Sequence, residues 1–258
     1  MTLYNSIGKG YNRTRQPDRR IVDRLIELLD LPPGKTIADV GAGTGNYSNA
    51  IADRGYEVVA IEPSATMRSQ ASTHSNVSWI PAVAESIPLA NNSVDGVIVM
   101  LALHHFQDIA IGIKEIDRIT AKGNIVIFAF EQSKISDFWL ADYFPYFIND
   151  TLKTFPNTPE IARQIKDLTQ REVEIISFLL PPDLSDRFAA AGWQKPEIYL
   201  DKSIRKGIST FSKMPPNDLK QGIERLQAEL NNGVWLSKYG ELKQLPRYDA
   251  GYRILIAR

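Results

Sequence analysis

Short apolar runs alternate with amphipathic stretches along the first half of the chain. The runs are rich in Val and Ile, whereas the amphipathic stretches repeat apolar positions every three to four residues. This alternation is typical of βαβ units and predicts a doubly wound α/β fold with a mainly parallel sheet. The predicted strands are 36–40, 57–61, 77–80, 94–100 and 124–130, and the predicted helices are 46–54, 64–72, 108–120 and one that Pro17 opens and that runs to Leu29.

The second half of the chain is less regular. Aromatic residues crowd between Trp139 and Phe147, which predicts an inserted lid over residues 131–180. Packing of an inserted helix pair is the favoured interpretation of these aromatics, and an apolar acceptor pocket or a cage for a cation is the alternative. The sheet is expected to resume at 196–200, after a helix that ends at 189–192, and to finish with a seventh strand at 252–257.

These elements predict one domain that spans residues 1–258. Its ligand-binding core covers 17–130, and the remainder of the sheet lies in 181–258, with a second covering segment at about 201–250. The chain is large enough for one substantial core of this kind.

The overall charge argues for a small-molecule partner. Lys plus Arg (30) equals Asp plus Glu (30), so no net field attracts the protein to nucleic acid or to a membrane surface. No apolar run could span a bilayer or serve as a signal peptide, which predicts a cytoplasmic protein. The absence of cysteine excludes a disulfide, a Cys nucleophile and a thiolate metal site, and no metal is expected.

Charge is uneven only near the start of the chain. The basic residues there outnumber a single acidic one, Asp18, and are Lys9, Arg13, Arg15, Arg19 and Arg20. A solvated helix entrance is the favoured interpretation, and anion binding is the alternative.

The most informative segment is a predicted strand that runs directly into a glycine loop and then into a helix. Gly41, Gly43 and Gly45 occupy alternate positions, so the backbone can turn sharply and a ligand can lie against the main chain. Glu62 follows the next strand, where a carboxylate can accept hydrogen bonds from both ribose hydroxyls of a nucleoside. An NAD(P)-dependent oxidoreductase shares this arrangement, but its fingerprint needs a third glycine where this chain has Asn46.

At this point the sequence resembles the class I S-adenosylmethionine-dependent methyltransferases, specifically the small-molecule type related to ubiquinone and menaquinone biosynthesis. DVGAGTG (39–45), VVAIEPSATM (58–67) and AVAESIPLANNSVDGVIVMLALHHF (82–106) carry the resemblance. It implies S-adenosylmethionine as cofactor, and an N-terminal segment, 1–16, that folds over this methyl donor. The residues implied in donor binding are Asp39, Gly41, Ala42, Gly43, Gly45, Glu62, Pro63, Ala84, Glu85, Met100, Leu101 and Tyr11. The family often has an Asp where this chain has Val83.

Methyl transfer from a sulfonium is an in-line displacement that requires alignment and exclusion of water more than a catalytic group. A base helps only where the acceptor must lose a proton, and His105, with His104 as second choice, is predicted for that role after the fourth strand. Packing at a strand end is the alternative for both histidines. Glu131, at the end of the fifth predicted strand, is another candidate carboxylate base, and an exposed loop position is its equal alternative. His74 is expected at the surface, and a catalytically silent donor-binding protein remains the alternative to an enzyme.

Overall fold

The computed structural model describes residues 14–258. Within this range seven strands form one sheet in the order β3-β2-β1-β4-β5-β7-β6. The strands are β1 (Thr36–Val40), β2 (Glu57–Ile61), β3 (Val77–Ile80), β4 (Gly96–Met100), β5 (Ile125–Phe130), β6 (Val173–Ser177) and β7 (Tyr252–Ala257). The first five run parallel, and β7 lies antiparallel between β5 and β6. The predicted α/β class and the mainly parallel sheet are confirmed.

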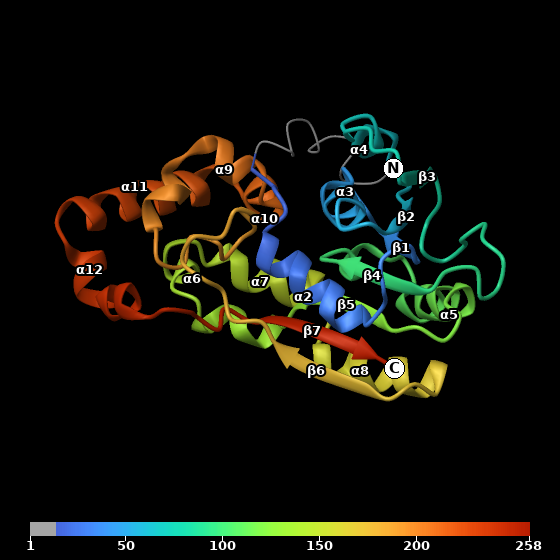
Figure 1. Cartoon of the computed structure of the whole chain (residues 1–258). Helices are drawn as coiled ribbons and strands as arrows, with labels where there is room; N and C mark the ends of the chain where they lie inside the picture. The colour runs from blue at the N-terminus through green and yellow to red at the C-terminus, as the bar shows by residue number, and fades with distance from the viewer. Residues whose placement is uncertain (1–13) are drawn as a thin grey trace.

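Helices cover both faces of the sheet (Figure 1). On one face lie α2 (Arg19–Leu29) and α3 (Asn46–Ala52), and on the other lie α5 (Ile109–Ile119) and α8 (Thr158–Thr169). Alternate residues of each central strand join different cores: Ile98 packs into the first, whereas Val97 and Val99 pack with Ile113 and Ile116 of α5 into the second. Burial on both faces explains why these strands are continuous apolar runs.

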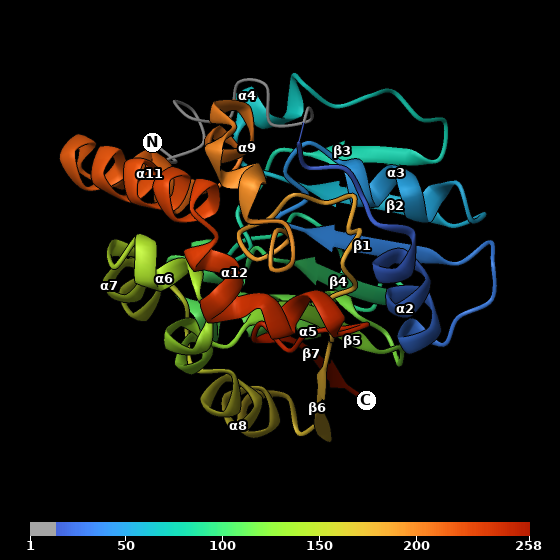
Figure 2. The ribbon, with the colours of Figure 1, turned by 90° about the vertical axis from the view of Figure 1, so that its left-hand side faces the viewer.

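Within residues 14–258, six further helices gather at the carboxyl ends of the parallel strands (Figure 1). They come from two separate parts of the sequence and are seen in front of the sheet when the molecule is viewed from that side (Figure 2). They are α6 (Leu140–Tyr143), α7 (Tyr146–Thr154), α9 (Lys202–Lys206), α10 (Ser209–Lys213), α11 (Pro216–Asn231) and α12 (Val234–Tyr239). We call this group the cap. A four-residue helix, α4 (Ala65–Arg68), follows β2.

Two predicted elements are wrong. Residues 196–200 are not a strand but a 3-10 helix, Pro196–Leu200, and no helix precedes them within 178–195. The Tyr199 hydroxyl donates to the Ala189 carbonyl at 2.7 Å and accepts from the Gly192 amide at 3.1 Å. These bonds hold the segment in a compact turn that lies outside the sheet.

The sheet position expected for 196–200 belongs to β6, which lies inside the predicted lid 131–180. Its alternation is weak because it is an edge strand with three of five residues exposed. The predicted lid therefore contains β6 and the helix that precedes it, α8, which packs against β6 and β7. No helix among residues 14–258 is long and apolar enough to cross a membrane.

Candidate functional site

The glycine loop lies between the carboxyl end of β1 and the start of α3. Gly41, Gly43 and Gly45 have φ angles of 79°, 60° and 74°, in the left-handed region that favours glycine. At Gly41 a Cβ would come within 2.4 Å of the Ala102 Cβ, so the loop after β4 approaches the backbone directly. Gly41 is therefore required by both conformation and space.

A cavity of about 370 Å³ opens beside this loop, and we call it the large cavity. Its size falls within the roughly 300–1,000 Å³ of small-molecule sites. Of the twelve residues that the resemblance implies in donor binding, ten line it, namely Asp39, Gly41, Ala42, Gly43, Glu62, Pro63, Ala84, Glu85, Met100 and Leu101. Two others do not join them: a Cβ at Gly45 would meet the Trp79 ring at 2.5 Å, and Tyr11 lies outside the described residues.

Glu62 is held at the end of β2 by the backbone. One carboxylate oxygen accepts from the Gly43 amide at 3.0 Å, and the other accepts from the Ser64 amide at 2.8 Å. Burial raises the pKa of Glu62, while these two amides favour the ionised form. Each carboxylate oxygen has a second lone pair, so Glu62 can accept two further hydrogen bonds from a ligand in the cavity.

Asp39 lies deeper, at 1% exposure. Oδ2 accepts from the Ser48 hydroxyl at 2.6 Å, whereas Oδ1 has no hydrogen-bond partner among the described residues. Burial raises the pKa of Asp39 to about 7, with the Ser48 hydroxyl opposing the rise and the Glu62 charge adding to it. A buried acceptor without a partner is costly, so this wall of the cavity is suited to a cationic donor from a ligand.

The opposite wall comes from the segments after β3 and β4. Glu85 accepts from the Gln107 and Asp108 amides with Oε1, and so it braces the turn that follows β4. Leu101 adopts φ 50°, which is uncommon for a bulky residue, and its amide donates to the Phe128 carbonyl. Val83, where the family often has Asp, also lines the cavity.

A second, smaller cavity of about 80 Å³ adjoins the first and shares Arg15 and Leu101 with it. We call it the small cavity. Its walls come largely from β5, β7, the cap and the loop 188–190, and they include six aromatic residues: Phe130, Phe138, Phe147, Phe155, Phe188 and Tyr252. Thr151, Ser209 and Thr210 add hydroxyl groups. The two cavities therefore meet at Arg15 and Leu101.

The adjacent histidines are divided between the cavities. His105 lines the large cavity and His104 lines the small one, where its ring lies 4.2 Å from that of Phe155. Burial lowers the pKa of His104 well below its ordinary value, and the positive charges of Lys213 and Arg15 lower it further. The pKa of His105 is lowered by partial loss of hydration and by Lys213. Both rings are therefore neutral at pH 7.

The structure also places the other residues that the sequence analysis considered, namely Glu131, His74 and the aromatic segment 139–147. Glu131 is 6% exposed, accepts from the Thr158 amide and hydroxyl and the Ser133 amide, and lines neither cavity. His74 lies near the surface beside Asp53. Of the aromatic segment, Trp139 packs between Tyr143 and Trp235, as the packing interpretation predicts, whereas Phe147 reaches the small cavity.

Arg15, Tyr47 and Asp186 are cavity residues that sequence reasoning missed. Asp186 follows a region without periodicity, and nothing in the sequence pairs it with residue 15. The basic cluster near the start of the chain was the only available signal for Arg15.

Comparisons with known proteins agree on one family. A model described as "Methyltransferase domain" matches residues 38–128. A solved structure from Anabaena variabilis, provisionally described as a methyltransferase from an antibiotic biosynthesis pathway, is 46% identical with a TM-score of 0.92, covering 95% of this chain and 99% of that chain. This chain belongs to the class I S-adenosylmethionine-dependent methyltransferases. The oxidoreductase and the catalytically silent protein are thereby set aside.

Relatives of this methyltransferase include quinone-modifying enzymes. The demethylmenaquinone methyltransferase of Corynebacterium urealyticum is 26% identical over 190 residues, which are 64% of this chain and 82% of that protein. A ubiquinone/menaquinone biosynthesis C-methyltransferase of Rubrivivax gelatinosus is 30% identical over 102 residues, 39% and 41% of the two chains. The resemblance seen in the sequence is confirmed, and S-adenosylmethionine is the cofactor.

Proposed function

We propose that the methyltransferase binds S-adenosylmethionine in the large cavity and methylates a small, mainly apolar acceptor in the small cavity. The observation that carries this proposal is the junction of the two cavities at Arg15 and Leu101. In an in-line displacement the acceptor atom, the methyl carbon and the sulfur lie on one line, so donor and acceptor must meet at a shared opening. The donor supplies an activated methyl group, and the protein supplies alignment.

The residues of the large cavity fit this donor. Glu62 accepts from the two ribose hydroxyls, and the glycine loop leaves room for the main chain to approach the donor. The partnerless Oδ1 of Asp39 accepts from the donor's ammonium group. Ala84, beside Val83, lies against the adenine through apolar contact, and Met100 and Leu101 lie near the methionine end.

The small cavity supports an acceptor with an aromatic or otherwise flat apolar body. Six aromatic side chains can bury such a body, while Thr210 and the His104 ring can contact a polar substituent. The names of the quinone-modifying relatives, and of the Anabaena protein, support a small molecule, with secondary metabolism as its context. We propose that one domain contains both sites, with 17–130 as the donor-binding core and the cap as the lid.

If the acceptor loses a proton, His104 is better placed than His105 to accept it, because His104 lines the acceptor side. Its neutral ring can take the proton directly or hold the acceptor's hydroxyl through a hydrogen bond. His105 lies on the donor side and is proposed to contact the donor.

The test begins with transfer of a labelled methyl group from S-adenosylmethionine into a cell extract that is separated into small-molecule, protein and nucleic-acid fractions. Once an acceptor is identified, single-turnover rates and melting temperatures of His104→Gln and His105→Gln are compared with those of the parent. A working base at His104 predicts a rate about 10²- to 10⁴-fold lower for His104→Gln, with binding of S-adenosylhomocysteine retained. Parental rates in both variants would leave alignment alone as the mechanism, and labelling of protein or nucleic acid only would overturn the small acceptor.

A further inference from the structure

The small cavity has no carboxylate in its wall within residues 14–258. Arg15 lines it, but this guanidinium is ion-paired with Asp186 at 2.5 Å. The other lining side chains are aromatic or aliphatic, apart from the hydroxyl groups and the neutral ring of His104. Charged groups behind this wall therefore influence which charge a ligand in the small cavity can carry.

A lysine of the cap lies behind the wall. Lys213 and Thr210 are one turn apart on α10, and both bind Asp150 of α7. Lys213 Nζ donates to the two Asp150 oxygens at 3.0 and 3.3 Å, and the Thr210 hydroxyl donates to Oδ2 at 2.8 Å. Thr210 and Thr151, the residue after Asp150, line the small cavity. The ammonium group is therefore fixed beside the residues that form the wall.

The charge of Lys213 also reaches the two histidines. It lowers the pKa of both His104 and His105, whose rings lie 3.9 Å apart. A proton on His104 would add a positive charge beside this lysine, in a position where burial already disfavours a charged ring. Of the two roles proposed for His104, a hydrogen bond from its neutral N–H to the acceptor is therefore favoured over acceptance of a proton.

These surroundings argue against a cationic acceptor. Aromatic faces attract cations, but the rings here contact one another, with Phe130 packing edge-on against Tyr252 at 5.2 Å and Phe155 at 5.6 Å. An ammonium compound would approach the positive charges of Lys213 and Arg15, and no carboxylate in the described wall would bind it. Like charges repel strongly where water is excluded.

From this arrangement we infer that Lys213, held by Asp150, selects an acceptor that binds as an anion, such as an ionised phenol or enol, and disfavours ammonium compounds. The inference rests on the proposed placement of the acceptor in the small cavity. The hydroxyl proton leaves to solvent before transfer. The anion then attacks the methyl carbon as the carbon–sulfur bond breaks, so an anion and a sulfonium become two neutral products. Lys213 acts through its charge and Asp150 positions it.

The experiment compares three single-ring probes of different charge on protein saturated with S-adenosylhomocysteine. At pH 8, 4-nitrophenol is mainly ionised, 4-nitrotoluene is neutral and benzylamine is mainly protonated. Calorimetry should show that the parent binds 4-nitrophenol about tenfold more tightly than 4-nitrotoluene, and benzylamine more weakly than 4-nitrotoluene. Lys213→Met should remove the tenfold preference for 4-nitrophenol and leave 4-nitrotoluene within about twofold, whereas Lys213→Arg should keep the preference.

Two further variants separate charge from folding. Lys238→Met is the matched control, because Lys238 is a cap lysine that is ion-paired with Glu229 at 2.8 Å and lines neither cavity. The double variant Lys213→Met with Asp150→Asn leaves no unpaired carboxylate behind the wall, so it should remain folded and show the same loss of preference. Melting temperatures measure the folding of each variant.

Each outcome decides a different point. Parental affinity for 4-nitrophenol in Lys213→Met and in the double variant would overturn the inference, as would equal weakening of 4-nitrophenol and 4-nitrotoluene, which would indicate a structural role. Tighter binding of benzylamine than of 4-nitrotoluene would overturn it in favour of a cation cage. Ala189→Phe, which adds a ring to the wall of the small cavity, should weaken all three probes. Unchanged binding in that variant would overturn the proposed acceptor site itself.

Discussion

Two carboxylates of the large cavity have lost most of their hydration through burial. Glu62 and Asp39 are carboxylates at 8% and 1% exposure, and burial raises the pKa of each. Such groups are destabilised without a ligand and are stabilised when a ligand supplies hydrogen-bond donors or positive charge. Substitution or protonation of either carboxylate should therefore change the affinity for the donor.

Glu62→Ala is expected to reduce donor affinity severely while the protein remains folded. The carboxylate would hold two ribose hydroxyls through charged hydrogen bonds worth about 1.5–3 kcal/mol each. Calorimetric titration with S-adenosylhomocysteine measures the loss. Glu57→Ala, at the exposed start of the same strand, is the control and should bind like the parent. Parental affinity in Glu62→Ala would contradict the placement of the ribose.

The raised pKa of Asp39 predicts that donor affinity depends on pH. The pKa of Asp39 is raised to about 7, so its carboxyl group becomes protonated as the pH falls below that value. An ammonium group binds the ionised form, so affinity for S-adenosylhomocysteine should fall between pH 8 and pH 5.5, approaching tenfold per pH unit below 7.

Two comparisons isolate the contribution of Asp39. Asp39→Asn should flatten the pH profile, and 5′-methylthioadenosine, which lacks the ammonium group, should bind with a weaker pH dependence. An identical profile for the parent and Asp39→Asn would refute the ammonium site.

At the scale of elements, the junction of β1 and α3 is the most demanding local structure. Gly41 has a positive φ and also faces the Ala102 Cβ, whereas Gly34 has φ 86° with no atom within 4 Å of the position that a Cβ would take. Substituting each glycine by alanine therefore distinguishes the free energy lost to backbone conformation from the free energy lost to steric contact.

Gly34→Ala should lower the free energy of unfolding by about 1 kcal/mol, because only the left-handed backbone conformation is penalised. Gly41→Ala should lower it by about 3 kcal/mol, since overpacking against Ala102 adds to the same penalty. Urea denaturation measures both changes, and only Gly41→Ala should weaken binding of S-adenosylhomocysteine. Equal effects of the two substitutions would show that the contact with Ala102 relaxes freely.

Element types in the second half depended on long-range pairing. Within residues 14–258, β6 is an edge strand that pairs with β7, about eighty residues later, whereas Pro196–Leu200 has an apolar pattern but becomes a 3-10 helix. Buried Tyr199 satisfies its hydroxyl within its own turn, so this segment packs its apolar side chains without adding a strand.

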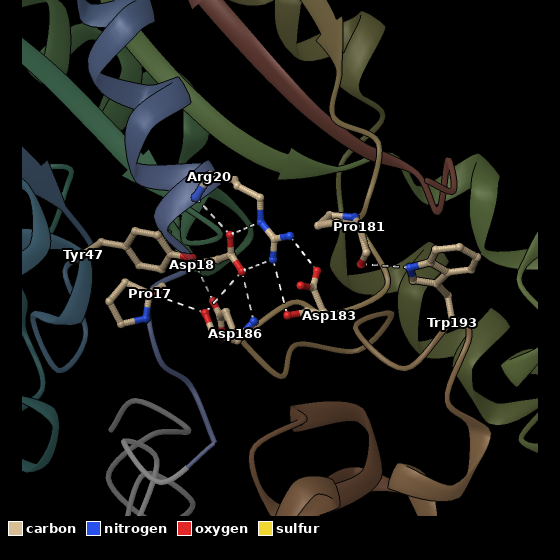
Figure 3. A network of polar contacts seen from close by, with 9 residues as sticks. Pro17, Asp18, Arg20, Tyr47, Pro181, Asp183, Asp186 and Trp193 are labelled. Atoms are coloured by element: carbon tan, nitrogen blue, oxygen red, sulfur yellow. Dashed lines mark hydrogen bonds and ion pairs between the residues drawn. The ribbon is translucent and has the colours of Figure 1, made fainter. Parts of the chain in front are cut away.

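At the scale of the whole molecule, residues near the start of the chain anchor the loop that leads from the sheet to the cap. Asp18 accepts from the Arg20 side chain and from the Ser185 amide, and Arg20 also reaches Asp183 (Figure 3). The same loop presents Asp186 to Arg15. Anchoring of this loop is therefore shared between fold stability and the proposed donor site.

The stability that Asp18 contributes to this anchoring depends on pH. Burial alone would raise the pKa of Asp18, but the hydrogen bonds from Arg20 and Ser185 outweigh it and lower the pKa to about 2. A depressed carboxyl pKa contributes stability above the ordinary value near 4, and this contribution is lost as the pH falls toward 2.

Asp18→Asn should therefore lower the free energy of unfolding by about 1–2 kcal/mol at pH 7, allowing for partial screening by solvent. Its deficit relative to the parent should shrink at pH 3, where the parent begins to lose the same contribution. Urea denaturation at the two pH values measures this difference. Asp183→Asn, at an exposed position, should have little effect at either pH. A deficit that stays constant with pH would assign Asp18 a role other than its charge.

The sequence by itself determined the donor-binding half of this protein. Strands 36–40 and 57–61 and the glycine loop are specified by local patterns, because burial on both faces requires continuous apolar runs and the loop requires glycine at positive φ. Asp39, Glu62 and the residues near them in the chain could be placed for the same reason: each lies at the carboxyl end of a predicted strand.

Only the tertiary structure decided which side chains from distant segments meet. Arg15 and Asp186 are separated by 171 positions, the small cavity combines residues from 15 to 252, and adjacent His104 and His105 line different cavities. No local pattern encodes these contacts, because they depend on how the cap packs over the sheet. Periodicity reports which face of an element is buried, and packing alone selects the partner that buries it.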